Sequence, residues 1–371
     1  MFLVNFQELK IEGLDLISLP KLCALLYLFT IIPHLKRFLS TENIKKFIFP
    51  LLALYIVIVV ANSVSSDSNS NTIFSFQLMQ FIVLFWIIIN HGKMYPLVIE
   101  KAMLSLAFGS VVLAILFYLG YGIEVYGGRM RMLGDNPNII GIRMVVASSI
   151  LTLAIIQNRL GFGKIRYLMA IPLPLLITLM VQTASRVAIL AFAITVIVGI
   201  LLFRSKVSIK RLISIPVGTI ILILIMQYII GDDLLRNRMF DTYEDHDFSG
   251  RLDIYNNLMP LVYQNPILGI GETGYRTMFG EASPHNVLLE VMIYSGIIGL
   301  ILYLTFISRI ILQALLSLEK TGYLLPLILL IPMFGFLLSG QILDKKLGWV
   351  TFAYIGSQQI YNINKTKENS E

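Results

Sequence analysis

Four arginines stand where apolar runs of the sequence begin or end. Arg129 and Arg131 precede one long apolar run, Arg186 starts another, and Arg251 follows Ser249-Gly250. A guanidinium is permanently charged and can hold a phosphate through two parallel hydrogen bonds. These arginines therefore predict a shared site for an anion such as a lipid-linked diphosphate. The alternative for each is an arginine that reaches lipid headgroups or pairs with a local carboxylate.

One histidine is placed to act as a base beside such an anion. His285 lies in Ser283-Pro284-His285-Asn286, directly before an apolar run. Imidazole titrates near neutral pH, so it can accept a proton from an attacking hydroxyl group. We therefore predict His285 as the general base. The alternatives are that His285 only caps the following helix or lies at the membrane interface, or that Asp253, Glu281 or Glu290 is the base.

Membrane-spanning helices must position these residues. The 371 residues are 57% hydrophobic and 14% charged, whereas a soluble domain is about 45–50% apolar and about 25% charged. A bilayer core about 30 Å thick needs about 20 apolar residues in a helix. We expect an all-α, polytopic membrane protein in a single membrane domain, residues 1–371, with about eleven (10–12) spans. The expected spans are Leu14–Ile32, Phe47–Ala61, Ile73–Ile89, Leu97–Leu119, Pro137–Ile156, Leu168–Val181, Val187–Phe203, Leu212–Ile230, Val287–Ile307, Leu324–Leu338 and Gly348–Ile360.

The distribution of positive charge predicts the orientation of these spans. The formal net charge is +7, but the Lys and Arg residues lie in short loops, which argues against a nucleic-acid-binding protein. Short loops rich in Lys and Arg face the cytoplasm. Alternating loops of this kind contain Lys36 to Lys46, Lys93, Arg159 to Arg166 and Arg204 to Arg211. The four arginines of the anion site and His285 then face outward.

The longest segment between spans, residues 231–286, also lies on the outer side. A loop of this length in a compact protein is usually functional. Apolar residues recur within it at helical spacing and predict an amphipathic helix at the membrane surface; they are Leu252, Tyr255, Leu258, Met259 and Val262. Backbone amides at the start of this helix would add to the attraction of Arg251 for an anion.

Other motifs for cofactors and metals are missing or lack the required context. Gly269 to Gly274 reads GxGxxG, but a dinucleotide site needs that motif between a strand and a helix, and a turn between spans is expected here. No Walker motif, HExxH pair or Cys/His zinc spacing occurs, and Cys23 is the single cysteine. We therefore expect no cofactor and no metal.

Four stretches in this order carry a resemblance to a known family. They are Arg129 to Gly141, with Gly134-Asp135-Asn136-Pro137-Asn138 at its centre; Thr183-Ala184-Ser185-Arg186; Ser249-Gly250-Arg251 leading to Asn265-Pro266-Ile267-Leu268-Gly269-Ile270-Gly271; and Pro284-His285-Asn286 with Gly296 and Gly299. Together they cover roughly residues 125–305. They resemble the O-antigen ligase and polymerase superfamily of bacterial surface-polysaccharide synthesis.

The resemblance implies metal-independent, inverting glycosyl transfer from an undecaprenyl-diphosphate-linked glycan. It implies that arginines of two outer loops contact the diphosphate and that a histidine at the end of the long loop is the base. These roles carry over to Arg131 or Arg129, to Arg251 and to His285, and Arg186 is placed to line the same cavity. The glycine that follows Arg251 is more distant than in the polymerase pattern, so the spacing does not select the subfamily.

Two activities fit the resemblance. A polymerase adds lipid-linked repeat units into O-antigen, capsule or exopolysaccharide, and a ligase moves the finished glycan to lipid A-core or another acceptor. We favour the polymerase, in the bacterial cytoplasmic membrane with its active site on the periplasmic or extracellular side. Its expected partners are membrane lipids, the lipid-linked glycan, a flippase and a chain-length regulator. A glycan transporter is the alternative from another class, and its site would lie at the midplane between two related halves.

Overall fold

The computed structural model describes residues 1–6, 10–11, 14–64, 73–126, 129–202, 251–280, 284–339, 343 and 345–358. Nearly all of these residues lie in helices, as the sequence predicts. The α-helices are α1 (Leu19–Ile31), α2 (Leu35–Phe38), α3 (Phe49–Val64), α4 (Ile73–Met94), α5 (Pro96–Tyr118), α6 (Pro137–Gln157), α7 (Leu173–Gln182), α8 (Arg186–Leu202), α11 (Arg251–Gln264), α12 (Gly271–Phe279), α13 (Val287–Thr321), α14 (Leu325–Ser339) and α15 (Lys346–Ser357). Shorter helical turns are η1 (Phe2–Phe6), η2 (Ile32–His34), η3 (Thr41–Asn43), η4 (Ile44–Ile48) and η5 (Gly163–Ala170).

The chain is an all-α polytopic membrane protein. By length and composition, seven described helical segments can cross a bilayer: Leu19–Phe38, Thr41–Val64, Phe74–Met94, Pro96–Tyr118, Pro137–Gln157, Gly163–Gln182 and Val287–Thr321. Two shorter apolar helices, α8 and α14, add to them. Of the other expected spans, Leu212–Ile230 lies outside the described residues, and Gly348–Ile360 corresponds to the 12-residue helix α15.

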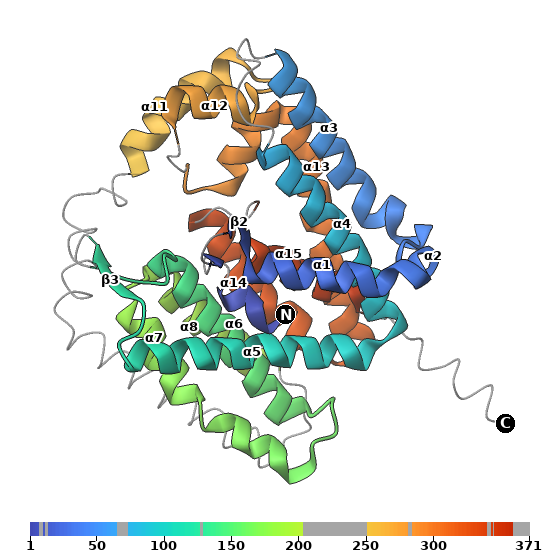
Figure 1. Ribbon diagram of the computed structural model, residues 1–371, viewed down its shortest axis with the longest axis vertical. Helices are drawn as coiled ribbons and strands as arrows, with labels where there is room; N and C mark the ends of the chain where they lie inside the picture. Colours follow the sequence, from blue (N-terminus) through green and yellow to red (C-terminus); the bar gives the residue numbers. More distant parts are fainter. Residues whose placement is uncertain are drawn as a thin grey trace.

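The helices form two groups with a shared interior (Figure 1). In one group α13 packs along α3, α4 lies against α15, and α12 covers both α3 and α13. In the other, α6 packs against α5, α7 and α8. Helix α14 joins the groups because it packs against α6, α8 and α13. Its Gly335 permits this close approach, since a Cβ there would lie 3.0 Å from Cγ1 of Val187.

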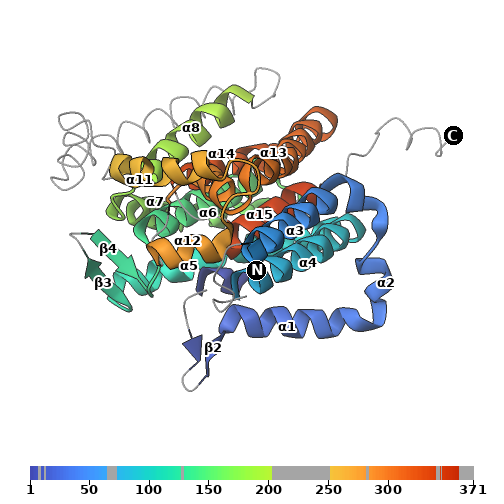
Figure 2. The same ribbon diagram turned by 90° about the horizontal axis from the view of Figure 1, so that it is seen from above.

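The N-terminal segment has one buried and one exposed part. The turn η1 is inserted against the middle of α5, where Asn5 donates to the Leu106 carbonyl at 2.8 Å. Helix α1, in contrast, lies on the outside of the bundle (Figure 2) and contacts α4 through the hydrogen bond between Tyr27 and His91. Only 11% of the apolar stretch within Leu19–Phe38 is buried. Such a surface suits contact with lipid rather than with protein.

Two small hairpins interrupt the helical architecture. Strands β1 (Lys10–Ile11) and β2 (Leu14–Ser18) pair before α1, and β3 (Ile123–Tyr126) and β4 (Arg129–Met132) pair between α5 and α6. The all-α fold that the sequence predicts includes neither hairpin. Because α5 and α6 pack side by side, their adjoining ends lie close enough for the connecting segments to pair.

Candidate active site

The hairpin β3–β4 presents the first two arginines. Arg129 and Arg131 are two residues apart in β4. Arg131 is half-buried and is the cross-strand partner of Glu124. The side chain of Arg129 lies outside the described part of the structure. Strand β4 therefore contains two arginines, and Glu124 lies opposite Arg131 on β3.

The stretch that follows the hairpin packs directly on the turn that carries Arg186. Asn136 caps α6, because its side chain accepts from the backbone N–H of Asn138 at 2.9 Å. One turn later, Gly141 faces this turn, since a Cβ at that position would lie 2.9 Å from Oγ1 of Thr183. The stretch Arg129 to Gly141 and the stretch Thr183 to Arg186, about 45 residues apart in the sequence, are therefore in contact.

The expected spans Leu168–Val181 and Val187–Phe203 are joined by a tight turn at Thr183–Arg186. Helix α7 ends at Gln182, and α8 begins at Arg186. Ala184 adopts a left-handed conformation with φ 49°. The fully buried Ser185 accepts from the backbone N–H of Ala188 at 3.3 Å. The turn holds the half-buried Arg186 at the start of α8, where the helix dipole favours an anion.

Helix α11 forms where the sequence predicts an amphipathic helix. Its Leu258 and Val262 are buried and its Tyr263 is exposed, so one face packs on protein. Arg251 is the first residue of α11, as expected. Its side chain and that of Asp253 lie outside the described part, as do Glu281 and residues 231–250 of the loop.

The segment Asn265 to Gly271 also packs on the segment around Gly296, through backbone contacts. The N–H of Ile270 donates to the Ile293 carbonyl, and the N–H of Ile297 donates to the Pro266 carbonyl, both at 2.8 Å. Gly296 lies between them and has φ 61° and ψ −163°, which breaks α13 into two helices. A Cβ on Gly296 would collide with the Ile267 carbonyl. The break orients the first helical turns of α13, which follow His285.

Replacing Gly296 by alanine is therefore expected to destabilise the protein by roughly 3 kcal/mol. Backbone strain and a collision with Ile267 both contribute. Thermal unfolding of the purified protein in detergent measures the loss. Gly322→Ala is the matched control, since Gly322 follows the same helix with φ 67° but has nothing within 4 Å of a Cβ. That control is expected to lose only about 1–2 kcal/mol, and equal losses for the two variants would contradict the role of the close approach.

His285 does not cap the helix that follows it. Asn286 is the N-cap of α13, and its side chain accepts from the backbone N–H groups of Leu288 at 3.0 Å and Leu289 at 3.3 Å. His285 is half-buried and has φ 52°, a left-handed conformation that is uncommon outside glycine. Such conformations concentrate at functional sites. The capping alternative for His285 is therefore wrong.

A buried cluster of acids and tyrosines lies beneath this end of α13. Glu272 and Glu290 are 1% and 3% exposed, and Glu272 forms an ion pair with Arg276 on α12. The rings of Tyr275 and Tyr294 pack at 5.7 Å. Burial, with a contribution from the charge of Glu290, raises the pKa of Tyr275 to about 12, so its phenol stays protonated at neutral pH.

The sequence did not single out this cluster, apart from Glu290 as an alternative base. It suggested a turn for Gly269 to Gly274, yet α12 begins at Gly271. The i,i+4 spacing of Glu272 and Arg276 was the available signal for a helix. Neither the spacing nor the composition indicates that Glu272 is buried, because its burial depends on contacts between α12, α3 and α13.

All four stretches lie toward the same end of the helix bundle. The ends of α6 and α13 meet: Gln157 donates to the Gly322 carbonyl at 2.8 Å and accepts from the N–H of Leu324 at 3.0 Å. The beginnings of α6 and α13, next to the hairpin and to His285, therefore point away from this junction. The structure thus brings the first stretch onto the turn that carries Arg186, and the third stretch onto the segment of α13 that follows His285.

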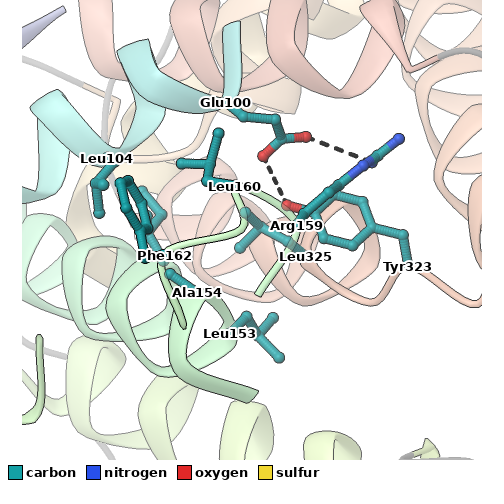
Figure 3. Close-up of a pocket in the computed structure, with 10 residues that line it drawn as sticks. Glu100, Leu104, Leu153, Ala154, Arg159, Leu160, Phe162, Tyr323 and Leu325 are labelled. Carbon is teal, nitrogen blue, oxygen red and sulfur yellow. Dashed lines mark hydrogen bonds and ion pairs between the residues drawn. The ribbon is translucent and has the colours of Figure 1, made fainter. Parts of the chain in front are cut away.

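The opposite end contains a mostly apolar pocket with a cluster of polar side chains on one side (Figure 3). Glu100, 6% exposed, accepts from the hydroxyls of Tyr323 at 2.7 Å and Tyr354 at 3.1 Å and pairs with Arg159 at 3.4 Å. The guanidinium of Arg159 lies over the ring of Tyr323 at 4.3 Å. Apolar side chains line the rest: Leu104, Ile150, Leu153, Ala154, Leu160, Phe162 and Leu325. Glu100 is about 27 Å along α5 from the hairpin, so this network joins helix ends away from the candidate active site.

Replacing Glu100 by leucine is expected to destabilise the protein by roughly 3 kcal/mol, because the buried Tyr323 hydroxyl loses its acceptor and Arg159 loses its ion pair. Tyr354 and Arg159 retain hydrogen bonds to Tyr323 and Gln358. Chemical unfolding followed by tryptophan fluorescence would report it. The matched control is Glu42→Leu, whose carboxylate is 75% exposed in its pair with Lys93. That change is expected to stay within about 0.5 kcal/mol. A Glu100→Leu variant as stable as wild type would show that the network is dispensable for stability.

Part of the chain is similar to a known protein family. A model described as O-antigen ligase matches residues 171–304. The resemblance to the O-antigen ligase and polymerase superfamily is confirmed. The matched segment runs from the start of α7 into α13 and includes Arg186, Arg251 and His285. No curated protein matches the chain. Among the described residues, no three His, Cys, Asp or Glu side chains are grouped as metal ligands.

Proposed function

We propose that the protein is a glycosyltransferase that polymerises undecaprenyl-diphosphate-linked repeat units into a surface polysaccharide. The observation that carries the proposal is the matched segment at residues 171–304, which contains Arg186, Arg251 and His285. The packing of these stretches toward one end of the bundle supports a common site. Arg131 and Arg129 join this site through the contact of α6 with the Thr183–Arg186 turn.

The residues fit an inverting transfer without a metal. His285 takes the proton of the acceptor hydroxyl, and the hydroxyl oxygen attacks the anomeric carbon of the donor glycan. The bond from that carbon to the phosphate oxygen breaks, and undecaprenyl diphosphate leaves with an added negative charge. Arg251 and Arg131, with Arg129 and Arg186, stabilise this charge, and fixed cations in a low-dielectric site are often the largest catalytic contribution.

The lipid substrate accounts for the membrane fold. Its polyprenyl tail stays in the bilayer while the diphosphate and glycan reach the surface. With about eleven spans and the basic loops in the cytoplasm, the hairpin, the Thr183–Arg186 turn and His285 face the periplasm or the cell exterior. The Glu100 network then lies at the cytoplasmic face. A flippase that delivers the donor and a chain-length regulator are the partners that such a polymerase requires.

Ligation of a finished glycan to lipid A-core is the second candidate, because the matching family is described as O-antigen ligase. The two activities share the donor and the chemistry and differ in the acceptor. The chain-length distribution of the surface glycan in a deletion strain separates them. Single repeat units on the acceptor indicate a lost polymerase, whereas long lipid-linked polymer that never reaches its acceptor indicates a lost ligase. A deletion with a normal surface glycan would contradict both.

A further inference from the structure

A buried arginine that the proposed mechanism does not use lies in α6. Arg143 is 1% exposed. Helix α6 is the most buried of the seven described candidate spans, because 78% of its apolar stretch lies inside the protein. Placing a charge at such depth is costly, and ionisable residues within spans usually have a functional role. The contacts of Arg143 indicate what that role is.

One guanidinium joins three segments. Nη1 of Arg143 donates to Oδ2 of Asp135 at 2.6 Å and to the Asn5 carbonyl at 3.1 Å. Asp135 is 4% exposed. Asn5 is in turn held on α5, where Oγ of Ser110 donates to its Oδ1 at 2.8 Å. The N-terminal turn, the end of the hairpin and α6 therefore meet at Arg143.

Stability alone does not account for this pair. Taking two charges out of water costs so much that apolar residues of similar volume are often equally stable or more so. The geometry is also not optimised, because Nε and Nη2 of Arg143 are buried without a hydrogen-bond partner among the described residues. What the pair does supply is a single fixed position for Asp135 relative to α6.

Asp135 is the residue through which the hairpin is held. Its backbone N–H donates to the Met132 carbonyl at 2.9 Å, which closes the turn after β4. Leu133 and Gly134, inside that turn, have φ of 51° and 80°. The N–H of Leu133 also donates to the Gly122 carbonyl at 2.8 Å. A shift of Asp135 would therefore move β4, and with it Arg131, as one piece.

We infer that the Arg143–Asp135 pair is a positioning device that sets the arginine strand β4 for the diphosphate of the donor. The inference rests on the proposed function. Arg143 acts through Arg131 and does not itself touch substrate. The N-terminal turn takes part through Asn5, so residues at the very start of the chain help to hold an arginine more than 120 positions later.

The test replaces the whole pair by apolar residues, in the double variant Arg143→Met and Asp135→Leu, so that no buried charge is left unpaired. We expect this variant to fold, and its kcat/KM for an undecaprenyl-diphosphate-linked repeat unit in proteoliposomes to fall about 10- to 100-fold. A structural role alone would not make the effect depend on Arg131. We therefore expect Arg131→Ala to cost much less in the double variant than in wild type.

A second readout does not depend on transfer. A spin label at Glu124, which is exposed on β3, is expected to become more mobile in the double variant. The control is Arg159→Met, which breaks the ion pair with Glu100 at the other end of the bundle. It should change neither the mobility of the spin label nor the loss of kcat/KM caused by Arg131→Ala. If the double variant does not fold, Asp135→Asn keeps an acceptor for Arg143 and is expected to lower kcat/KM several-fold.

The outcomes separate this inference from the proposed function. Wild-type kcat/KM in the folded pair variant, or in Asp135→Asn where that variant is used, would overturn the positioning role. An equal cost of Arg131→Ala in both backgrounds would do the same. A wild-type protein that transfers no glycan would overturn the proposed function, and the spin label would still report whether the pair holds the hairpin.

Discussion

Replacing His285 by asparagine is expected to lower the rate of glycan transfer by about 10²–10⁴-fold, because the acceptor hydroxyl loses its base. Asparagine is the informative substitution, since it tolerates the left-handed conformation that His285 adopts at φ 52°. An alanine variant would combine loss of the base with backbone strain. Initial rates with purified protein and a lipid-linked repeat unit measure the effect.

The pH profile gives the same prediction a second readout. With His285 as the base, the wild-type rate rises with pH as the imidazole loses its proton. The asparagine variant is expected to lose that rise as well as the rate. The matched control is His34→Asn, because His34 is exposed in η2, between α1 and α2. Wild-type activity in His285→Asn would exclude the imidazole as base and favour the buried Glu290.

Replacing an arginine that is proposed to bind the diphosphate is expected to lower the rate of transfer by a similar factor. Arg251→Ala and Arg131→Ala should each reduce kcat by about 10²–10³-fold, because the departing diphosphate loses a fixed positive charge. Lysine at either position should recover part of the rate, since it keeps the charge but not the two parallel hydrogen bonds. Rates at saturating donor separate this loss from weaker binding.

The matched control for these variants is Arg166→Ala. Arg166 contacts Tyr167 in η5, away from the candidate site, and its removal lowers the net charge by the same amount. We expect a change of less than about twofold for it. If Arg166→Ala and Arg251→Ala reduce the rate equally, general electrostatic attraction to the membrane explains the effect, and the arginines have no specific role.

The sequence alone predicted the features that depend on residues close together in the chain. The spacing of Leu258 and Val262 predicted the helix α11, and these side chains are buried. The expected spans Leu168–Val181 and Val187–Phe203 left only a short connection, and the turn at Thr183–Arg186 forms there. In both, the sequence separation is small, so hydrophobic periodicity and chain geometry determine the outcome.

Features that depend on tertiary contacts were not predicted. The hairpin that carries Arg131 forms because α5 and α6 bring its strands together, and its four-residue strands are too short for a periodic signal. The pairings of Gly141 with the Thr183–Arg186 turn and of Gly296 with Ile267 are backbone approaches between distant segments. The burial of Glu272 and the Arg143–Asp135 pair likewise depend on the packing of neighbouring helices.

The most direct test of the central claim is transfer by the purified protein alone. Proteoliposomes that contain it, an undecaprenyl-diphosphate-linked repeat unit and EDTA are followed for glycan length, anomeric configuration and released undecaprenyl diphosphate. The account predicts longer lipid-linked chains, an inverted linkage, and one undecaprenyl diphosphate released for each bond formed. Movement of an unchanged lipid-linked glycan between leaflets, with no new linkage, would contradict it and identify a transporter.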